Sequence, residues 1–434
     1  MKNAFMWKLI YFGITYASVF TGYYVTTSFL NIIYPNDAFI GFAIFYAVAG
    51  LGCLVSPYVI EKLPLKLSLF IAILLYLIFI GAVSSYNPIF MLIAYGFAGI
   101  GSSLIWLIQG IWTSSFKANI SPNNKELNKN VTTVIMINNV SSNLVLNTPK
   151  TDNKNTSEKG QSMGIFYAIF SINMILGNVT ALIILITNVS LQIMIWCMLG
   201  VSSIGLILCL FISSNTIEVP ITKTGLFQHI LDVILIIKDN FMMIIPVFSQ
   251  SMGLNITFQI LPRMMRNTLG PVAVYNSAVF LAYGVSYALT SLATGKLLEK
   301  NWRYVIYPYV ILETCSLIGI LMLATFNQLS GYWIIIGFVR GITDNAINNT
   351  CNVTFSKNIP TDLSFAFYRL IYSFTYILGS LVVGYIPYQY VLLIAFIISI
   401  TGVITFHLHM YYYTTLPITP SIEQQFNDSS TILI

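Results

Sequence analysis

The sequence predicts an all-α polytopic membrane protein with about twelve transmembrane helices. The chain of 434 residues is 57% hydrophobic and only 8% charged, and its mean hydropathy is +0.80. Soluble domains carry about 25% charged residues, so this composition cannot cover the surface of a soluble fold. Apolar runs of about 20 residues, the length that crosses a hydrocarbon core about 30 Å thick, recur along the whole chain.

Polar breaks divide the chain into twelve apolar runs, each of which we expect to span the membrane. The runs cover residues 8–33, 38–60, 66–86, 89–115, 163–187, 191–213, 241–261, 272–294, 304–326, 331–354, 364–386 and 389–412. The first run follows Lys2 and Lys8. It is too long for the apolar region of a signal peptide, so we expect it to be retained as an anchor.

Two hydrophilic stretches give the chain its expected domain organisation. Residues 117–160 are rich in Asn and Lys and cannot bury enough apolar surface to fold alone, so we expect a flexible cytosolic insertion. In the linker 214–240, one face of an expected amphipathic helix holds Phe227, Ile230, Ile234 and Ile237. The expected units are an N-terminal six-helix bundle (1–213), the cytosolic linker (214–240), a C-terminal six-helix bundle (241–412) and a cytosolic tail (413–434).

Basic residues indicate the orientation of the chain, because Lys and Arg in short loops stay on the cytosolic side. With a cytosolic start and twelve spans, Arg263 and Arg266 are the only cations that fall in expected outer loops. Both termini should therefore be cytosolic, and the sequons at Asn130 and Asn139 should not be glycosylated. The net charge of +6 reflects this topology and indicates no nucleic-acid partner. The lipid bilayer is the expected partner, either in the plasma membrane or in an endomembrane.

The two halves of the chain repeat each other. The segment VIEK before the third span corresponds to LLEK before the ninth, at an offset of 238 positions. The same offset aligns Gly99 with Gly337 and Ser103 with Gly341. Within each half, the two aligned residues have the small-xxx-small spacing that lets helices approach closely: Gly99 with Ser103, and Gly337 with Gly341. A parallel six-plus-six duplication is the arrangement of the major facilitator superfamily, whose substrate cavity lies between the halves near the membrane midplane.

Longer segments resemble one branch of that superfamily. The fourth-span segment GFAGIGSSLIWLIQGIWTSSF resembles the signature of the uncoordinated-93-like family, also called the ion channel regulatory protein family. The segments GQSMGIFYAIFSINMILGN, GFVRGITDNAINNT and LSFAFYRLIYSF resemble its fifth, tenth and eleventh spans. Three features depart from the pattern. The loop SPYVIEKLPLKLSL lacks the Asp and paired glycines of the general sugar and drug transporter signature, the sequence is short for the family, and the Asn-rich insertion is not typical of it.

This resemblance implies two functions of different classes. The first is a transporter that carries a small solute through a midplane cavity between the halves. The second is a non-transporting regulator or trafficking partner of an ion channel or membrane receptor. A fold does not by itself decide between them. An open polar cavity would favour the transporter, and a filled interior would favour the partner protein.

Charged residues inside the expected spans mark the main candidate sites. Arg340, Asp344 and Asn348 are spaced i, i+4 and i+8, so they share one face of the tenth span. A charge at such depth costs at least about 2.5–3.5 kcal/mol, so each one needs a partner or water. Depths counted along the spans make Glu313 the expected partner of Arg340, and Arg369 that of Asp344. These buried ion pairs are either locks between helices or part of a ligand or proton site.

Amides and one aromatic ring are the further cavity candidates. Trp106 and Gln109 lie near each other on the fourth span, and Asn255 and Gln259 share a face of the seventh. Together with the polar face of the tenth span, they would line the cavity in the superfamily arrangement. The alternative is that these amides only bond across neighbouring helices, where such a bond contributes about 0.6 kcal/mol.

The sequence gives little support for enzymatic chemistry. It contains no G-x-x-x-x-G-K-[ST] loop, so ATP-driven pumping is not expected. The five cysteines all fall within expected spans and form no CxxC pair, which indicates neither a disulfide framework nor a zinc site. We therefore expect no enzyme activity, no metal and no cofactor.

Overall fold

The N-terminal half is a bundle of long helices. The computed structural model describes residues 2–34, 37–115, 164–212, 226–266, 272–326, 331–358 and 361–415. The helices of this half are α1 (Lys2–Ile33), α2 (Ala38–Lys62), α3 (Leu65–Val83), α4 (Pro88–Ser115), a helical segment at 164–170 that continues through Ser171 into α7 (Ile172–Ile186), and α8 (Leu191–Leu210). The expected insertion, with its two sequons, lies outside the described residues.

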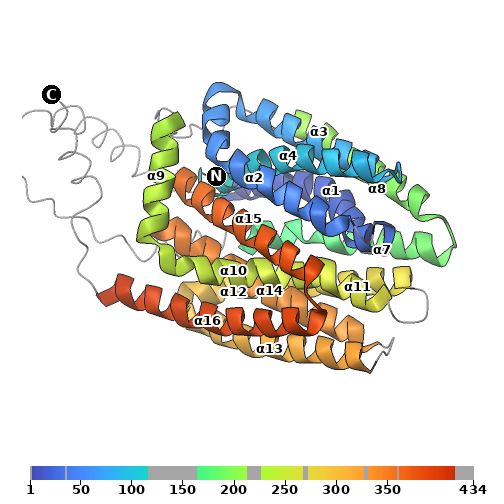
Figure 1. The fold of residues 1–434 in the computed structure, drawn as a ribbon. Helices are drawn as coiled ribbons and strands as arrows, with labels where there is room; N and C mark the ends of the chain where they lie inside the picture. Colours follow the sequence, from blue (N-terminus) through green and yellow to red (C-terminus); the bar gives the residue numbers. More distant parts are fainter. Residues whose placement is uncertain are drawn as a thin grey trace, which may run out of the picture.

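The C-terminal half follows a short linker helix, α9 (Leu226–Asp239). Its helices are η2 (Phe241–Met243), α10 (Ile244–Asn255), the π-helical turn η3 (Ile256–Ile260), α11 (Leu261–Arg266), α12 (Val272–Lys300), α13 (Arg303–Thr325), α14 (Tyr332–Asn358), α15 (Thr361–Tyr385) and α16 (Tyr388–Thr415). The segment from η2 to α11 forms one span, so every expected span coincides with a helix or with consecutive helices. Figure 1 shows them gathered side by side in one elongated bundle.

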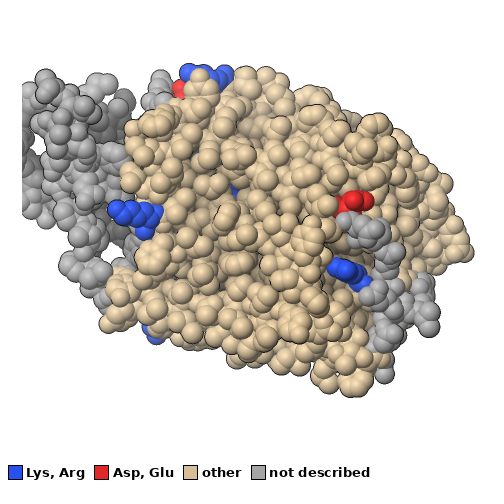
Figure 2. Space-filling model, viewed as in Figure 1, with Lys and Arg blue, Asp and Glu red and all other residues tan. Residues whose placement is uncertain are grey.

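The surface and the helix lengths are those of a multi-pass membrane protein. Ten helical segments in the described part of the chain are long and apolar enough to cross a membrane. The helices α1 and α14 fall below that level of hydropathy because they turn many Thr, Ser and Asn side chains into the interior. Figure 2 shows a broad surface with few Lys, Arg, Asp or Glu side chains, which sit mainly toward its edges.

Close helix approaches occur at the small residues that the internal repeat aligns. In the N-terminal half, a Cβ on Gly99 would lie 2.6 Å from the Phe45 carbonyl oxygen of α2. In the C-terminal half, a Cβ on Gly337 would lie 2.5 Å from the Val279 carbonyl oxygen of α12. One turn further along α14, Gly341 leaves no room for a Cβ beside the carbonyl of Tyr283. The small residues therefore set the same α2–α4 and α12–α14 contact in both halves.

A small polar group completes the N-terminal version of this contact. Ser103 lies one turn after Gly99 on α4, and Ser56 of α2 donates a 2.9 Å hydrogen bond to its hydroxyl. A Cβ on Gly52 would lie 2.5 Å from the same Ser103 oxygen. Ser103 and Gly341 therefore hold equivalent positions in the two halves. At the first a hydroxyl contacts the neighbouring helix α2, and at the second the backbone of α12 comes close instead.

The two halves meet along two pairs of helices. The helix α2 packs along α15, and α7 packs along α12. The linker helix α9 is steeply inclined to the bundle in Figure 1 and contacts both α2 and α15 at one end. On α9, Val233 and Ile236 are buried, while Phe227 and Ile234 of the expected apolar face are exposed.

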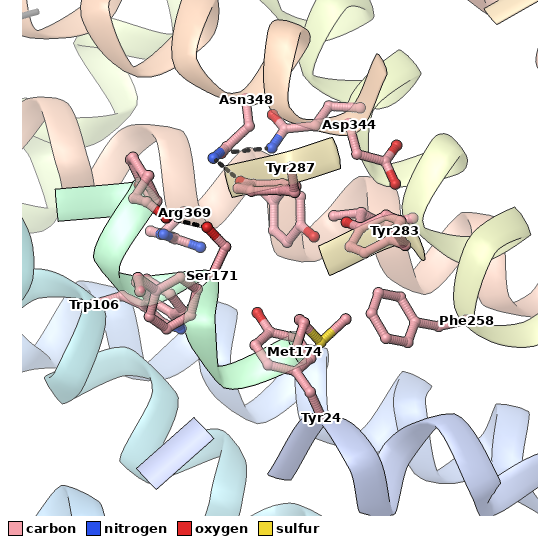
Figure 3. A pocket seen from close by; sticks show the side chains of 15 residues that line it. Tyr24, Trp106, Ser171, Met174, Phe258, Tyr283, Tyr287, Asp344, Asn348 and Arg369 are labelled. Carbon is pink, nitrogen blue, oxygen red and sulfur yellow. Dashed lines mark hydrogen bonds between the residues drawn. The ribbon is translucent and has the colours of Figure 1, made fainter. Parts of the chain in front are cut away.

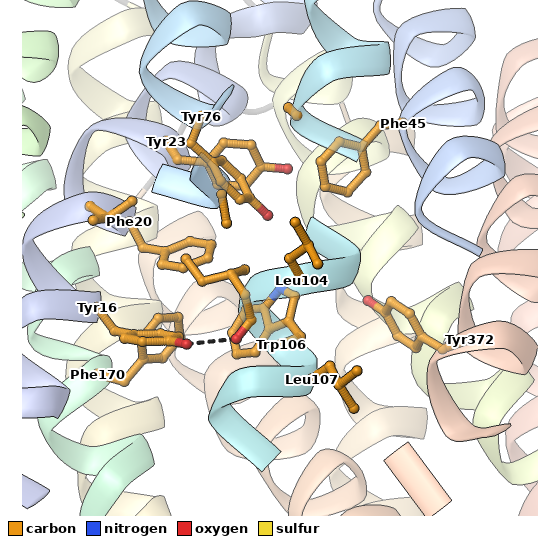
Figure 4. Packing of buried hydrophobic residues seen from close by; sticks show 14 of the residues in the cluster. Tyr16, Phe20, Tyr23, Phe45, Tyr76, Leu104, Trp106, Leu107, Phe170 and Tyr372 are labelled. Carbon is orange, nitrogen blue, oxygen red and sulfur yellow. Dashed lines mark hydrogen bonds between the residues drawn. The ribbon is translucent and has the colours of Figure 1, made fainter. Parts of the chain in front are cut away.

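Aromatic side chains fill the interior of the N-terminal half. The Phe20 and Trp106 rings are 5.1 Å apart between centroids, and the Tyr23 and Tyr76 rings are 4.8 Å apart. The Tyr16 hydroxyl donates a 2.6 Å hydrogen bond to the Ile105 carbonyl, which joins α1 to α4 (Figure 4). This half is therefore held mainly by ring packing, which offers few polar groups to a ligand.

Candidate functional site

A cavity lies between the two halves of the protein. It has about 610 Å³ of space between atoms, part of which is open to solvent, and residues of both halves form its walls. The N-terminal half contributes mostly rings and apolar chains, including Tyr24, Trp106 and Met174 (Figure 3). A second cavity of about 540 Å³ shares Trp106 and Arg369 with the first, so the two adjoin.

The C-terminal half supplies a polar wall centred on Asn348. Its side-chain oxygen Oδ1 accepts hydrogen bonds from the Gln250 amide at 2.9 Å and the Tyr368 hydroxyl at 3.1 Å. Its own amide donates to the Tyr287 hydroxyl at 2.9 Å (Figure 3). These partners come from α10, α15 and α12, so one asparagine of α14 connects four helices. The predicted cavity residue Asn348 does line the cavity, and its amide is held in one orientation.

Behind this wall, Arg340 lies between two carboxylates. Its Nη1 is 2.5 Å from Oε2 of Glu313 on α13, and its Nη2 is 2.8 Å from Oδ1 of Asp344. All three side chains are buried, at 0%, 1% and 3% exposure respectively. The predicted pair of Arg340 with Glu313 is therefore present. With all groups ionised, the cluster carries two negative charges for one positive charge.

Thr257 ties the seventh span to this cluster, and the sequence does not single it out. Arg340 Nε donates to the Thr257 hydroxyl at 3.0 Å, and that hydroxyl donates to Asp344 Oδ2 at 3.1 Å. Thr257 lies in the π-helical turn η3, whose extra residue per turn displaces the side chains that follow. Such turns are frequent at functional sites. A regular helical period does not anticipate them, so only the structure places Thr257 here.

The expected pair between Arg369 and Asp344 does not form. Asp344 is bound instead by Arg340, which lies one turn away on the same helix and reaches it without crossing the cavity. The Arg369 guanidinium carbon lies 4.5 Å from the Trp106 ring centroid, across from the acidic cluster. Figure 3 shows Arg369 beside Trp106 and apart from Asp344. Arg369 of α15 and Asp344 of α14 thus line the same cavity without forming an ion pair.

Three predicted amides lie away from these two cavities. Asn255 accepts hydrogen bonds from Gln259 at 2.5 Å and from Ser380 of α15 at 2.9 Å. Gln259 also donates to Ser380 at 2.9 Å, so both amides join α10 and η3 to α15. Gln109 is fully buried in α4. The alternative of bonds between helices therefore describes Asn255 and Gln259 better than the cavity interpretation.

Comparisons with known proteins agree with this architecture. A family model described as Major Facilitator Superfamily matches residues 151–364. The crystal structure of a mutant of the nucleoside transporter NupG superposes with a TM-score of 0.60, at 14% identity, over 93% of this chain and 99% of that one. The chain has the major facilitator superfamily fold. A comparison with curated proteins finds no match.

The major facilitator fold explains why the polar wall and the aromatic wall face each other. In this fold the two halves enclose a central cavity near the midplane, and ligands bind where the halves meet. Here the aromatic half offers rings for stacking, while the polar half offers an amide network and a carboxylate. In other proteins, pockets of this composition hold small molecules by shape and by a few placed polar groups.

Proposed function

We propose that this protein is a carrier that moves a small solute across a membrane through the cavity between its halves. The observation that carries the proposal is the cavity itself, which both halves line with rings and with the Asn348 network. A protein that serves only as a scaffold has no need for an internal space walled by oriented polar groups. The match to the superfamily model and the fold similarity to NupG support the same function.

The second candidate is a non-transporting partner of an ion channel or membrane receptor. The resemblance of the fourth, tenth and eleventh spans to the uncoordinated-93-like family supports it. A protein of that kind needs no solution access to its centre from either side. Access to the cavity therefore separates the two functions without knowledge of the solute.

The test is thiol labelling at one cavity position and one matched buried position. The five native cysteines are replaced first, and Met174→Cys or Met252→Cys is then introduced. Met174 lines the cavity, whereas Met252 lines neither of the two cavities and is packed in the core of the C-terminal half. A membrane-impermeant thiol reagent is applied to either side of the membrane in sealed vesicles.

A carrier alternates its access, so Met174→Cys should react from both sides, while Met252→Cys should react from neither. If Met174→Cys reacts from neither side in correctly folded protein, the carrier proposal is wrong. In that case the partner function remains.

A further inference from the structure

Arg369 is a half-buried cation without an acidic partner in the described part of the chain. It lies on α15 and lines both cavities. The ion pairs in the described residues join Arg340 to Glu313 and Asp344, and Lys62 to Glu61. No hydrogen bond from the Arg369 guanidinium to another described residue is present, and its buried Nε has no acceptor. The side chain is thus positioned, but its donors are unused.

Ring contacts hold the guanidinium at the cavity wall. Its central carbon lies 4.5 Å from the Trp106 ring centroid, 5.4 Å from that of Tyr368 and 5.8 Å from that of Tyr372. Cation–π contacts stabilise a charge through the ring faces, but they do not satisfy N–H donors. An arginine carries five such donors in a fork that matches a carboxylate or a phosphate. The rings therefore orient Arg369 and leave its hydrogen-bonding edge available.

The other charged residue that lines the cavity is Asp344, and its carboxylate already has hydrogen-bond partners. Both Asp344 oxygens are engaged, Oδ1 by Arg340 and Oδ2 by Thr257. Arg340 in turn uses all three of its nitrogens on Glu313, Asp344 and Thr257. Of the two charged residues that line the cavity in the described part of the chain, Arg369 is therefore the one with a hydrogen-bond donor that lacks an acceptor, and an anion would supply one. A charged residue within a membrane protein that lacks a partner is most simply explained by a ligand.

We propose that Arg369 is the anion-binding residue of the cavity, and that the solute is a small organic anion with an aromatic or apolar body. Its carboxylate or phosphate binds the Arg369 fork. Its body packs among the Tyr24, Trp106 and Phe258 rings, which line the same space. This inference rests on the proposed function only in calling the bound molecule a transported solute, because anion binding at Arg369 is measurable without transport.

The test is the thermal stability of the purified full-length protein with four probes of one shape. Benzoate and phenyl phosphate carry the two anionic groups, benzamide is the neutral match of benzoate, and benzylammonium is a cation. The anions should raise the melting temperature, and the other two should not. A response to only one of the anions identifies the carboxylate or the phosphate as the preferred group.

Variants connect the binding to Arg369. Arg369→Gln should weaken binding of the preferred anion by about 10- to 100-fold, because a charge-assisted hydrogen bond is lost. Arg369→Lys keeps the charge but not the fork, and it should fall between the two. Arg263→Gln, which changes an exposed arginine of the same half, is the matched control and should bind as the parent does.

Several outcomes overturn the proposal. Equal shifts with benzamide or benzylammonium, no shift with either anion, or unchanged anion binding in Arg369→Gln would each do so. A structural role for Arg369 would instead lower the melting temperature of Arg369→Gln without ligand and leave the selectivity unaltered. If Met174→Cys is inaccessible but anions bind through Arg369, the site stands and the carrier proposal fails. If Met174→Cys is accessible and anions do not bind, the carrier proposal stands and this one fails.

Discussion

Arg340 and Asp344 lie one helical turn apart on α14, and their side chains form a 2.8 Å ion pair inside the C-terminal half. The same guanidinium also holds Glu313 of α13 at 2.5 Å. One cation is therefore paired with carboxylates from two helices. Its removal and the removal of a carboxylate should have very different effects.

Arg340→Gln should be strongly destabilising, because it leaves Glu313 and Asp344 buried together without a counter-charge. Loss of one partner from a buried ion pair costs about 3–5 kcal/mol, and here two partners depend on it. Protein abundance and the detergent-solubilised melting temperature are the measurements. Arg263→Gln is the control and should match the parent, whereas equal stability of both variants would contradict the assigned role of Arg340.

Glu313→Gln and Asp344→Asn should each be mild, while the double variant should be severe. Each single change leaves Arg340 paired with the remaining carboxylate and brings the cluster to zero net charge. The double change strands the arginine in a buried site, so we expect a coupling of about 3 kcal/mol in the double-mutant cycle. Additive melting-temperature changes would show that the two carboxylates do not share Arg340.

Gly341→Ala should destabilise the packing of α14 on α12, because the new Cβ would meet the Tyr283 backbone and the Ser286 hydroxyl. Overpacking of this kind costs about 1–3 kcal/mol. Gly200→Ala on α8 is the matched control, since no atom lies within 4 Å of its Cβ position. The control should keep or slightly raise the melting temperature, because alanine is the better helix former. A similar response of both variants would argue against the close approach at Gly341.

The orientation of the chain is tested in the segment between α4 and the helix at 164–170. In intact cells, an epitope tag inserted near Asn143 should be protected from antibody. It should become accessible once the plasma membrane is permeabilised, because the tag lies in the cytosol. Asn130 and Asn139 should remain unmodified in the same samples. Glycosylation at either sequon, detected as a mobility shift removed by glycosidase, would reverse the predicted topology.

The fold could be predicted from the sequence because a bilayer imposes strong rules on composition and length. Apolar runs of spanning length located the helices, including α1 and α14, whose hydropathy is lower. The aligned pair Gly99 and Gly337 also pointed to equivalent helix contacts, because close approach needs the same small residues in both halves.

The candidate site was only partly predictable. The depth of Glu313 and Arg340 along their helices sufficed to pair them. The prediction that Asp344 pairs with Arg369 was wrong. Depth along a helix does not give the direction in which a side chain points, and Arg340 reaches Asp344 from the same face of α14. Thr257 could not be found at all, since a π-helical turn leaves no regular period in the sequence.

The polarity of α14 bears on how the chain enters the bilayer during synthesis. A helix with Arg340 and Asp344 that met lipid alone would expose both charges, at roughly 2.5–3.5 kcal/mol each. Its partners Thr257, Ser291 and Glu313 all precede it in the sequence, so they are already translated when α14 emerges. The order of synthesis thus allows Arg340 and Asn345 of α14 to meet these partners as soon as the helix enters the membrane.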